Sequence, residues 1–424
     1  MRIRRLQRLS VILLIAIGTV FILDRSTLAL ANHNVSADLR LSPVQMGMLL
    51  SAFSWAYAFS QLPVGALLDF IGGRIVLGIG IIVWACAQAF TGSVSSLSEF
   101  VTARVLLGLG EAPIYPAGAK IIAEWFNKRE RGAPTGLFLA STTIGPVLAP
   151  PIITALLFTL GWRKMYLALG ILGITLSLAW FFFAPSRADL VCNAADRAYF
   201  EDESLHHAST FSFTQFRALL AQRSTWGLIL GFVGIIYMVW LYLTWLPFYL
   251  EHERHFSIKR VGWMLSIPYI FGTIGNVFSG YLADGLLKHG FSVINSRKYP
   301  ICIGLLGGAA FTVPMAYTSH TTVAIVYLCC VMFFLYIASA GAWALVNVVA
   351  PRSKIATIGS LQNFAGYFGG SFAPVITGIL LENTQSFKAA FMLSAIIAIA
   401  SALFYFLLVK EPIVDAGPAV RSTI

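Results

Sequence analysis

Residues 11–31 read VILLIAIGTVFILDRSTLALA, an apolar stretch that is interrupted by the adjacent charges of Asp24 and Arg25. About 20 consecutive apolar residues are enough for a helix to cross a bilayer. A charge well inside such a helix is costly unless it meets a partner or a water-filled cavity, and it usually marks a functional site. The stretch therefore predicts a membrane-spanning helix that carries part of such a site.

The composition of the whole chain supports a membrane protein. Of its 424 residues 58% are hydrophobic and only 11% are charged, whereas roughly a quarter of an ordinary soluble domain is charged. The first apolar stretch is too long for a cleaved signal peptide, and no A-x-A-like site follows it. We expect it to be retained as the first span.

Apolar runs separated by charged or Pro/Gly-rich joints predict an all-α membrane protein with about twelve transmembrane helices. The predicted spans cover residues 9–31, 43–68, 75–92, 99–121, 134–158, 165–184, 225–250, 261–284, 299–317, 322–349, 356–381 and 388–409.

A polar stretch over residues 186–224 divides these spans six and six. It predicts an N-terminal six-helix half (1–185), a cytoplasmic linker (186–224) and a C-terminal six-helix half with a short cytoplasmic tail (225–424). A sequence pattern that occurs in both halves supports two parallel repeats, because GALLD (65–69) ends the second span and GYLAD (280–284) ends the eighth. We expect Gly65, Asp69 and Arg74, together with Gly280 and Asp284, to form a conformational motif.

The distribution of positive charge predicts the orientation of the chain. If both termini are cytoplasmic, most of the 29 Lys and Arg residues fall in cytoplasmic segments. This asymmetry follows the positive-inside rule. It accounts for the net charge of +11 without a nucleic-acid partner, so the expected partner of the chain is a lipid bilayer.

The stretch GALLDFIGGR (65–74) resembles the loop between helices 2 and 3 of the major facilitator superfamily, and the resemblance covers nearly the whole chain. Further segments narrow the resemblance to one family, because they are similar to the bacterial anion:cation symporter family and most closely to its galactonate and glucarate transporters. These segments are LDRSTLALA (23–31), LSAFSWAYAFSQLPVGALLD (50–69), RVLLGLGEAPIYPAG (104–118), EWFNKRERG (124–132) and LTWLPFYL (243–250).

This resemblance implies the major facilitator fold and alternating access, with import of a sugar acid by proton symport. It also implies a bacterial inner (plasma) membrane location. The family includes carriers of hexuronates, aromatic acids and dicarboxylates, so the substrate stays open among these small organic anions. Coupling to sodium, or exchange, is the alternative to protons, and a monomer is expected.

The charged residues predict an anion site. Arg104 and Glu111 are seven residues apart, which is about two helical turns and leaves them on nearly the same face. Arg104 lies about 8 Å below the outer surface and Arg25 about 24 Å above the inner one, so both lie at a similar depth in a core of about 30 Å. Two guanidinium groups at one level suit a carboxylate, since each is a rigid fork of donors.

The two acids predict proton coupling. An arginine that moves from a carboxylate to a substrate anion would favour protonation of that carboxylate, so Glu111 and Asp24 are the expected proton carriers. The resemblance agrees, because the family's matching acids are implicated in coupling and the arginines that match Arg25 and Arg104 in recognition or coupling. The alternative is that the four charges only form buried ion pairs.

Five further residues are expected to contact substrate. By resemblance, Tyr57 and Asn363 match a substrate-contacting tyrosine and asparagine, with helix packing as the alternative. Trp245 is either a substrate contact or an anchor at the membrane interface. Thr142 stands where the galactonate-type carriers have a glutamine, and Asn347 faces either the cavity or a neighbouring helix.

Other chemistry is not indicated. The five cysteines show no C-x-x-C spacing, and no H-E-x-x-H, P-loop or G-x-S-x-G signature occurs. A metal and a cofactor are therefore not expected. A membrane-embedded enzyme would need a convergent His, Cys or Ser constellation within the spans, so the sequence favours a secondary active transporter and not an enzyme.

Overall fold

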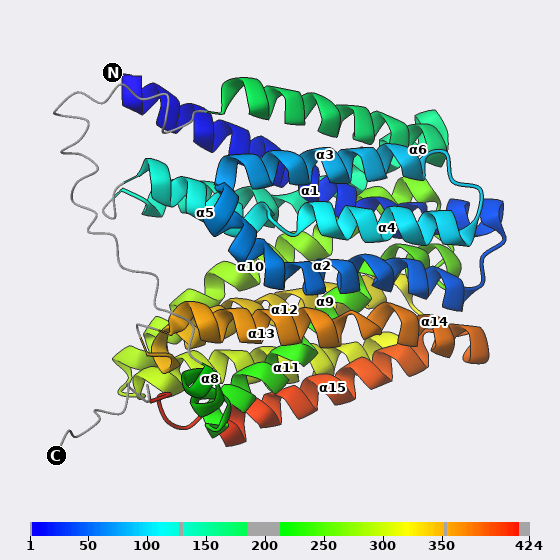
Figure 1. Cartoon of the computed structure of the whole chain (residues 1–424). Helices are drawn as coiled ribbons and strands as arrows, with labels where there is room; N and C mark the ends of the chain where they lie inside the picture. Colours follow the sequence, from blue (N-terminus) through cyan, green and yellow to red (C-terminus); the bar gives the residue numbers. More distant parts are fainter. Residues whose placement is uncertain (1, 127–129, 185–212, 352–353, 415–424) are drawn as a thin grey trace, which may run out of the picture. The chain divides into compact units, whose positions relative to one another are not determined.

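The computed structural model describes the chain except for residues 1, 127–129, 185–212, 352–353 and 415–424. The side chains of residues 2, 62, 66, 69, 140, 142–144, 213–216 and 356 also lie outside the description. Helices are the only regular elements in the described part (Figure 1). They group into two compact units, residues 1–208 with 244–266 and residues 209–243 with 267–424, which are described separately below as unit 1 and unit 2.

Unit 1 contains the first six helical elements and the segment around the end of α9 and the start of α10. Its helices are α1 (Arg2–Leu39), α2 (Pro43–Ile71), α3 (Gly73–Thr91), α4 (Leu97–Glu111), α5 (Ile114–Trp125) and α6 (Gly132–Phe183). Within this unit α1 and α3 both pack along α6, and α4 packs against α2 and α3.

Unit 2 contains the remaining helices. They are α8 (Phe213–Leu220), α9 (Arg223–His252), α10 (Ile258–Lys288), α11 (Val293–Tyr317), α12 (Thr321–Val349), α13 (Ile355–Gly370), α14 (Phe372–Thr384) and α15 (Lys388–Leu408). The most extensive packing in this unit joins α11 to α12 and to α15.

Most predicted spans coincide with one helix each. The fourth span consists of α4 and α5, and the eleventh of α13 and α14. The fifth and sixth spans together form α6, which turns sharply at Gly161 (φ 73°, ψ 166°). Nine helical segments of the described chain, with α13 and α14 counted as one, are long and apolar enough to cross a membrane. The remaining predicted spans lie in α2, in the first part of α6, and in the α4–α5 pair, whose two members are short.

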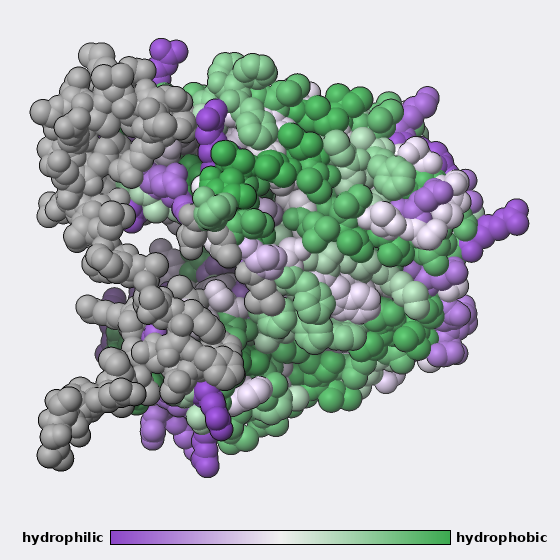
Figure 2. Space-filling view, in the orientation of Figure 1, coloured by the Kyte–Doolittle hydropathy of each residue, from purple (hydrophilic) through white to green (hydrophobic). Residues whose placement is uncertain are grey.

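Large apolar side chains cover the outer faces of the helices. Figure 2 shows hydrophobic residues along the helices and hydrophilic residues gathered near their ends. Phe70 is 92% exposed and Phe182 is 81% exposed. Contiguous exposed apolar surface on this scale is untypical of a soluble monomer and fits a protein whose solvent is lipid.

The joint between α2 and α3 follows from local sequence. Ser42 caps α2 in a capping box with Gln45, and Pro43 occupies the first helical turn, where its missing N–H costs nothing. Gly72 ends α2 with φ 94°, a conformation that favours glycine, and α3 begins at the next residue. Of the GGR stretch in the predicted loop, only Gly72 forms the turn, and the next two residues belong to α3.

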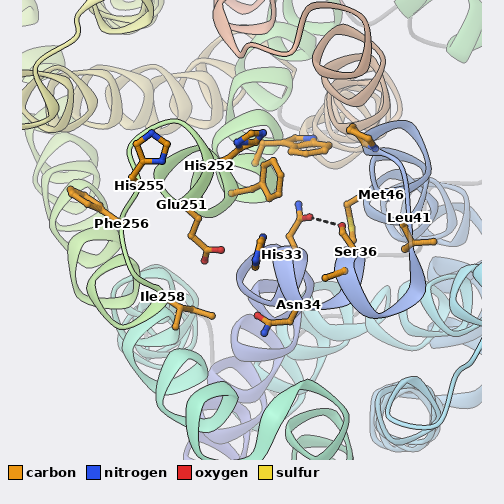
Figure 3. Close-up of a pocket in the computed structure, with 15 residues that line it drawn as sticks. His33, Asn34, Ser36, Leu41, Met46, Glu251, His252, His255, Phe256 and Ile258 are labelled. Atoms are coloured by element: carbon orange, nitrogen blue, oxygen red, sulfur yellow. Dashed lines mark hydrogen bonds between the residues drawn. The ribbon is translucent and has the colours of Figure 1, made fainter.

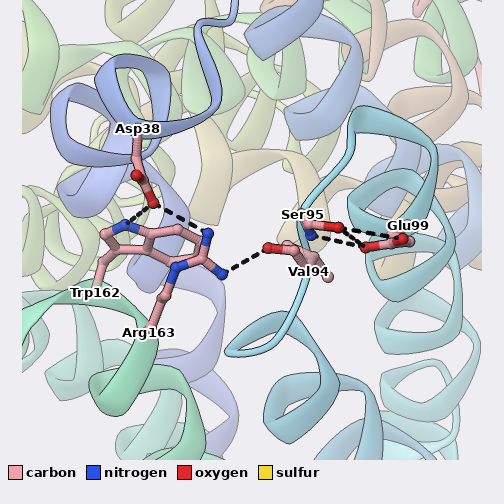
Figure 4. Close-up of polar contacts among 6 residues, drawn as sticks. All are labelled: Asp38, Val94, Ser95, Glu99, Trp162 and Arg163. Carbon is pink, nitrogen blue, oxygen red and sulfur yellow. Dashed lines mark hydrogen bonds and ion pairs between the residues drawn. The ribbon is translucent and has the colours of Figure 1, made fainter.

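Polar side chains tie the turn in α6 to two other segments of unit 1 (Figure 4). Asp38, in the last turn of α1, accepts hydrogen bonds from Trp162 Nε1 (3.2 Å) and Arg163 (3.1 Å). The same Arg163 donates to the carbonyl of Val94 at 2.6 Å, between α3 and α4. Glu99 accepts from the backbone N–H of Ser95 at 2.7 Å and so orders the start of α4. These contacts fix this end of unit 1.

Candidate functional site

The buried charges of α1 and α4 meet as an ion pair. Arg25 Nε lies 3.0 Å from Glu111 Oε2, and the two side chains are 7% and 0% exposed. Glu111 Oε1 is buried and has no hydrogen-bond partner in the described residues. The sequence predicted that these residues share a site, and the structure adds that Arg25 pairs with the acid of another helix and not with its neighbour Asp24.

Arg104 lies in the same cluster. Its charge interacts with those of Glu111, Arg25 and Asp24. Its Nε donates a long hydrogen bond of 3.4 Å to the carbonyl of Leu49, while its Nη1 is buried without a partner among the described residues. The structure thus brings the two predicted guanidinium groups together and leaves one of them with an unused donor.

Asp24 is held by an amide and not by a cation. It is fully buried, and its Oδ1 accepts a hydrogen bond of 3.0 Å from Gln88 Nε2 on α3. Thr27 turns its hydroxyl back to the carbonyl of Asp24 at 2.7 Å. Gln88 was missed by the sequence analysis, which searched the spans for charge. A lone amide inside the apolar stretch WACAQAFT was the available signal.

Aromatic rings surround the guanidinium groups. Arg25 lies over the rings of Phe21 (4.1 Å to the centroid), Tyr57 (4.5 Å) and Phe53 (5.1 Å). The centroid of the Phe53 ring also lies 4.9 Å from the guanidinium of Arg104, so both cations contact this ring. Such contacts compensate part of the cost of burying a guanidinium. Tyr57 therefore contacts a predicted site arginine, whereas the two phenylalanines could not be singled out from the sequence.

The glycines of α4 explain why Glu111 reaches this position. A Cβ on Gly108 would lie 2.5 Å from the carbonyl oxygen of Phe53 on α2, and one on Gly110 would lie 2.5 Å from the backbone nitrogen of Trp84 on α3. Glycine at both places lets the three backbones approach closely. Glu111 is the last residue of α4, two residues before Pro113, which has no backbone N–H to donate. Ala112 and Pro113 keep right-handed helical torsions, so the acid lies at a proline joint between α4 and α5 and not in an unwound segment.

Two predicted contact residues belong to unit 2. Asn363 is half-buried on α13, and Asn347 is exposed on α12. Next to Asn363, Gln362 is fully buried and neither atom of its amide has a hydrogen-bond partner in the described residues. Gly366, one turn further along α13, lies tightly against Phe232 and Ile236 of α9. Gln362 is a second polar group that the sequence analysis missed.

Two further predicted contact residues, Trp245 and Thr142, belong to unit 1. Trp245 is buried, packs edge-on against Phe248 at 5.8 Å and groups with unit 1, although the chain order placed it in the C-terminal half. It lines a cavity at the end of α1 (Figure 3). Thr142 lies within α6, but its side chain is outside the described residues.

The predicted conformational motif is partly described. Arg74 donates to the carbonyl of Phe181 at 2.8 Å, near the end of α6, whereas the side chain of Asp69 lies outside the description. A Cβ on Gly65 or Gly280 would meet no atom within 4 Å. In unit 2, Asp284 forms an ion pair of 2.9 Å with Arg297 at the start of α11.

The residue after Arg297 repeats the role of Arg74. Lys298 donates to the carbonyl of Val409 at 2.9 Å, directly after the end of α15. A cation at the start of the third helix in each half therefore caps the end of the sixth, where the carbonyls lack partners. This parallel agrees with the repeat that the sequence predicts.

Comparisons with known proteins identify the family. The profile of the Major Facilitator Superfamily matches residues 14–374. The "Probable L-galactonate transporter" of Escherichia coli (strain K12) is 41% identical over 98% of this chain and 92% of its own length. The "Probable galactarate/D-glucarate transporter GarP" of the same strain is 32% identical over 95% of each chain.

Solved structures agree on the fold. A bacterial homolog of the human lysosomal transporter Spinster, in an inward-facing and unoccupied conformation, superposes with a TM-score of 0.80 at 17% identity, over 95% of this chain and 97% of the other. The D-xylose-proton symporter gives 0.75 at 15% identity with the same coverage. The predicted fold class is thus confirmed. The prediction that the chain is a transporter and not an enzyme is confirmed as well. The chain belongs to the Major Facilitator Superfamily of multi-pass membrane transporters.

Proposed function

We propose that this transporter imports a sugar acid of the galactonate or glucarate type by proton symport. The names of the relatives at 41% and 32% identity support the substrate class. The proposed location is the inner membrane of a bacterium, with both termini in the cytoplasm, because that orientation gives the cytoplasmic side the excess of Lys and Arg.

The observation that carries the proposal is the buried Arg25–Glu111 ion pair beside a second arginine. Removing one partner of a buried pair leaves an uncompensated charge, which is strongly unfavourable. A substrate carboxylate that binds Arg25 must therefore displace Glu111, and the displaced carboxylate is stabilised by taking up a proton. Substrate and proton then enter together.

Arg104 and Asp24 complete the proposed cycle. Arg104 has a buried, unpartnered Nη1 that can donate to the same carboxylate. Asp24 forms no ion pair within 4.0 Å among the described residues and is hydrogen-bonded to neutral Gln88, so it is the second proton carrier. Neutralisation of both acids removes the charges that oppose closure, and the halves then change from outward-open to inward-open.

The remaining predicted contacts would serve the hydroxyl-rich part of the substrate. Tyr57 adjoins Arg25, and we assign it to the N-terminal side of the binding site together with Thr142 and Trp245. Asn363 and Asn347 would contribute amides from the C-terminal half. Each assignment predicts a raised KM for the sugar acid on substitution by alanine, with the variant still present in the membrane.

The two-half organisation, with residues 1–185 and 225–424 joined by a linker over 186–224, remains part of the proposal. Most of that linker lies outside the described residues. Gly65, Asp69 and Arg74, with Gly280 and Asp284, would control the change of conformation, and the ion pair of Asp284 with Arg297 supports such a role. We propose a monomer, which light scattering coupled to size-exclusion chromatography would test.

Uptake into proteoliposomes tests the proposed function. The purified full chain is reconstituted, and proton and sodium gradients are imposed independently in the presence of labelled L-galactonate, glucarate, a hexuronate, an aromatic acid or a dicarboxylate. We expect a pH gradient, alkaline inside, to drive accumulation of a sugar acid, and a sodium gradient to have no effect. Accumulation driven by sodium alone, or transport of none of the sugar acids, would refute the proposal.

A further inference from the structure

A cavity lies in unit 1 at the end of α1, and the residues of the arginine cluster are not part of its lining. It has a volume of about 770 Å³ and is lined from α1, from the start of α2 and from the segment around the end of α9 (Figure 3). Asn32, His33, Asn34 and Ser36 contribute from α1. A cavity of this size holds a small metabolite.

Several polar atoms in its wall have no partner. Asn32 is 1% exposed, and its Oδ1 accepts a hydrogen bond from Ser36 at 3.1 Å, which fixes the amide, but its Nδ2 bonds to nothing in the described residues. Asn34 Oδ1 and Glu251 Oε1 are likewise buried without a partner there. Since buried polar groups are normally satisfied, one free donor and two free acceptors point to a ligand with several hydroxyl groups.

The opposite part of the wall is aromatic. Trp245, Phe248 and Phe256 line the cavity from α9 and the segment after it. Trp245 and Phe248 pack edge-on at 5.8 Å, so their rings face different directions. Apolar walls with a few placed polar groups are typical of small-molecule sites, and rings can cover the C–H faces of a polyol.

The lining also carries imidazole groups. His33, His252 and His255 line the cavity together with a single acid, Glu251 (Figure 3). An imidazole N–H can donate a hydrogen bond to a carboxylate. No group of three or more His, Cys, Asp or Glu side chains among the described residues is arranged to hold a metal ion.

The other charged groups on the surrounding elements have different contacts. Asp38 accepts from Trp162 and Arg163, while Arg254 donates to the hydroxyl of Tyr249. Lys259 and Arg260 lie over the rings of Phe158 and Phe256. The other nearby charges are Arg40 at the end of α1 and Glu253 after α9. None of these six lines the cavity.

We propose that this cavity is an outer subsite that holds a polyhydroxylated carboxylate before it reaches Arg25, with imidazole N–H groups receiving the carboxylate and Asn32 and Asn34 the hydroxyl groups. The inference rests on the proposed function, because it assumes a sugar acid arriving from the side where α1 ends.

The register of α1 connects this subsite to the arginine cluster. Asn32 follows Arg25 by seven residues, which is about two turns, so both lie on nearly the same face of the helix and about 10 Å apart along its axis. Trp245, a predicted substrate contact, is part of the lining of the subsite. A ligand released from the cavity along this face of α1 therefore arrives at the guanidinium of Arg25.

Equilibrium binding of labelled L-galactonate to the purified full chain tests the proposal. Arg25→Ala removes the contact at the arginine cluster, so binding that remains in this variant reports the outer subsite. We expect residual binding in this variant. Asn32→Ala in the same background weakens that binding by about three- to tenfold. His33→Gln, His252→Gln and His255→Gln combined weaken it by a similar factor, and His320→Gln, outside the cavity, is the matched control.

The outcomes separate this inference from the proposed function. Wild-type binding with none in Arg25→Ala, or residual binding that is unchanged by Asn32→Ala, refutes the subsite and leaves the transport proposal intact. A wild type that neither binds nor transports any sugar acid refutes both. Uptake by Asn32→Ala in the otherwise wild-type chain gives an independent result if Arg25→Ala does not fold. A raised KM with an unchanged maximal rate supports the subsite, and an unchanged KM refutes it.

Discussion

Replacing Glu111 by glutamine should uncouple substrate binding from protons. In the wild type the ionised Glu111 occupies Arg25 at 3.0 Å, so a substrate carboxylate must compete with it. A hydrogen bond to a charged group contributes about 1.5–3 kcal/mol. Glutamine keeps the shape but not the charge, and it therefore removes most of this competition.

The size of the effect follows from that energy. Since about 1.4 kcal/mol corresponds to a factor of ten, anion affinity at pH 8 should rise about 10- to 150-fold in Glu111→Gln. At a pH low enough to protonate Glu111 the wild type also loses this charge, so the two proteins should bind alike there. The affinity of the variant should thus be almost independent of pH, while that of the wild type rises as the pH falls.

Binding of labelled L-galactonate from pH 5.5 to 8.5 measures the affinities, and proteoliposomes measure transport. We expect Glu111→Gln to lose accumulation driven by a pH gradient and to retain counterflow exchange, which moves no net proton. Glu382→Gln, an exposed acid at the end of α14, is the control. Proton-driven accumulation by Glu111→Gln, or the wild-type dependence of its affinity on pH, would refute the reasoning.

Three further substitutions test separate contacts. Gln88→Leu leaves the ionised Asp24 without its hydrogen bond of 3.0 Å, so proton-driven uptake should fall about tenfold while counterflow exchange is less affected. Equal losses in both assays would contradict a role of Gln88 in proton coupling. Gly108→Ala places a Cβ 2.5 Å from a backbone carbonyl and should destabilise the protein by about 1–3 kcal/mol in thermal unfolding. Gly285→Ala, with open space around the added Cβ, should not destabilise it, and equal stability of the two variants would argue against the close approach. Asp284→Asn breaks a largely exposed ion pair, so the free energy of unfolding should change by less than about 1 kcal/mol while uptake falls several-fold. Unchanged uptake would exclude a conformational role for Asp284.

The spans were predictable because length and apolarity alone decide what crosses a bilayer. Charge inside the spans likewise pointed to Asp24, Arg25, Arg104 and Glu111 as one cluster, since helical rise gives depth without any knowledge of packing. The partner of Arg25 was not predictable, because depth does not specify how each helix is rotated. That rotation depends on glycine contacts such as those of Gly108, which involve three helices at once.

Neutral polar residues were the main omission. Gln88 and Gln362 are fully buried in apolar helices, and each leaves at least one amide atom without a partner in the described residues. A search for charges passes over them, although a buried amide is also costly in an apolar medium. Likewise, the grouping of Trp245 with unit 1 depends on tertiary packing at the end of α9, which chain order does not reveal.

The break between α4 and α5 also bears on how the protein enters the membrane. With 15 and 12 residues, neither helix alone reaches the length of about 20 that a span requires. The pair also carries Arg104 and Glu111, and charged residues near the centre of a span disfavour insertion by a few kcal/mol each. The first span, made earlier during synthesis, already holds Arg25, the countercharge of Glu111. Assembly of the fourth span against the first would therefore neutralise the acid during biogenesis, so the ion pair that we propose to couple transport to protons would also assist insertion.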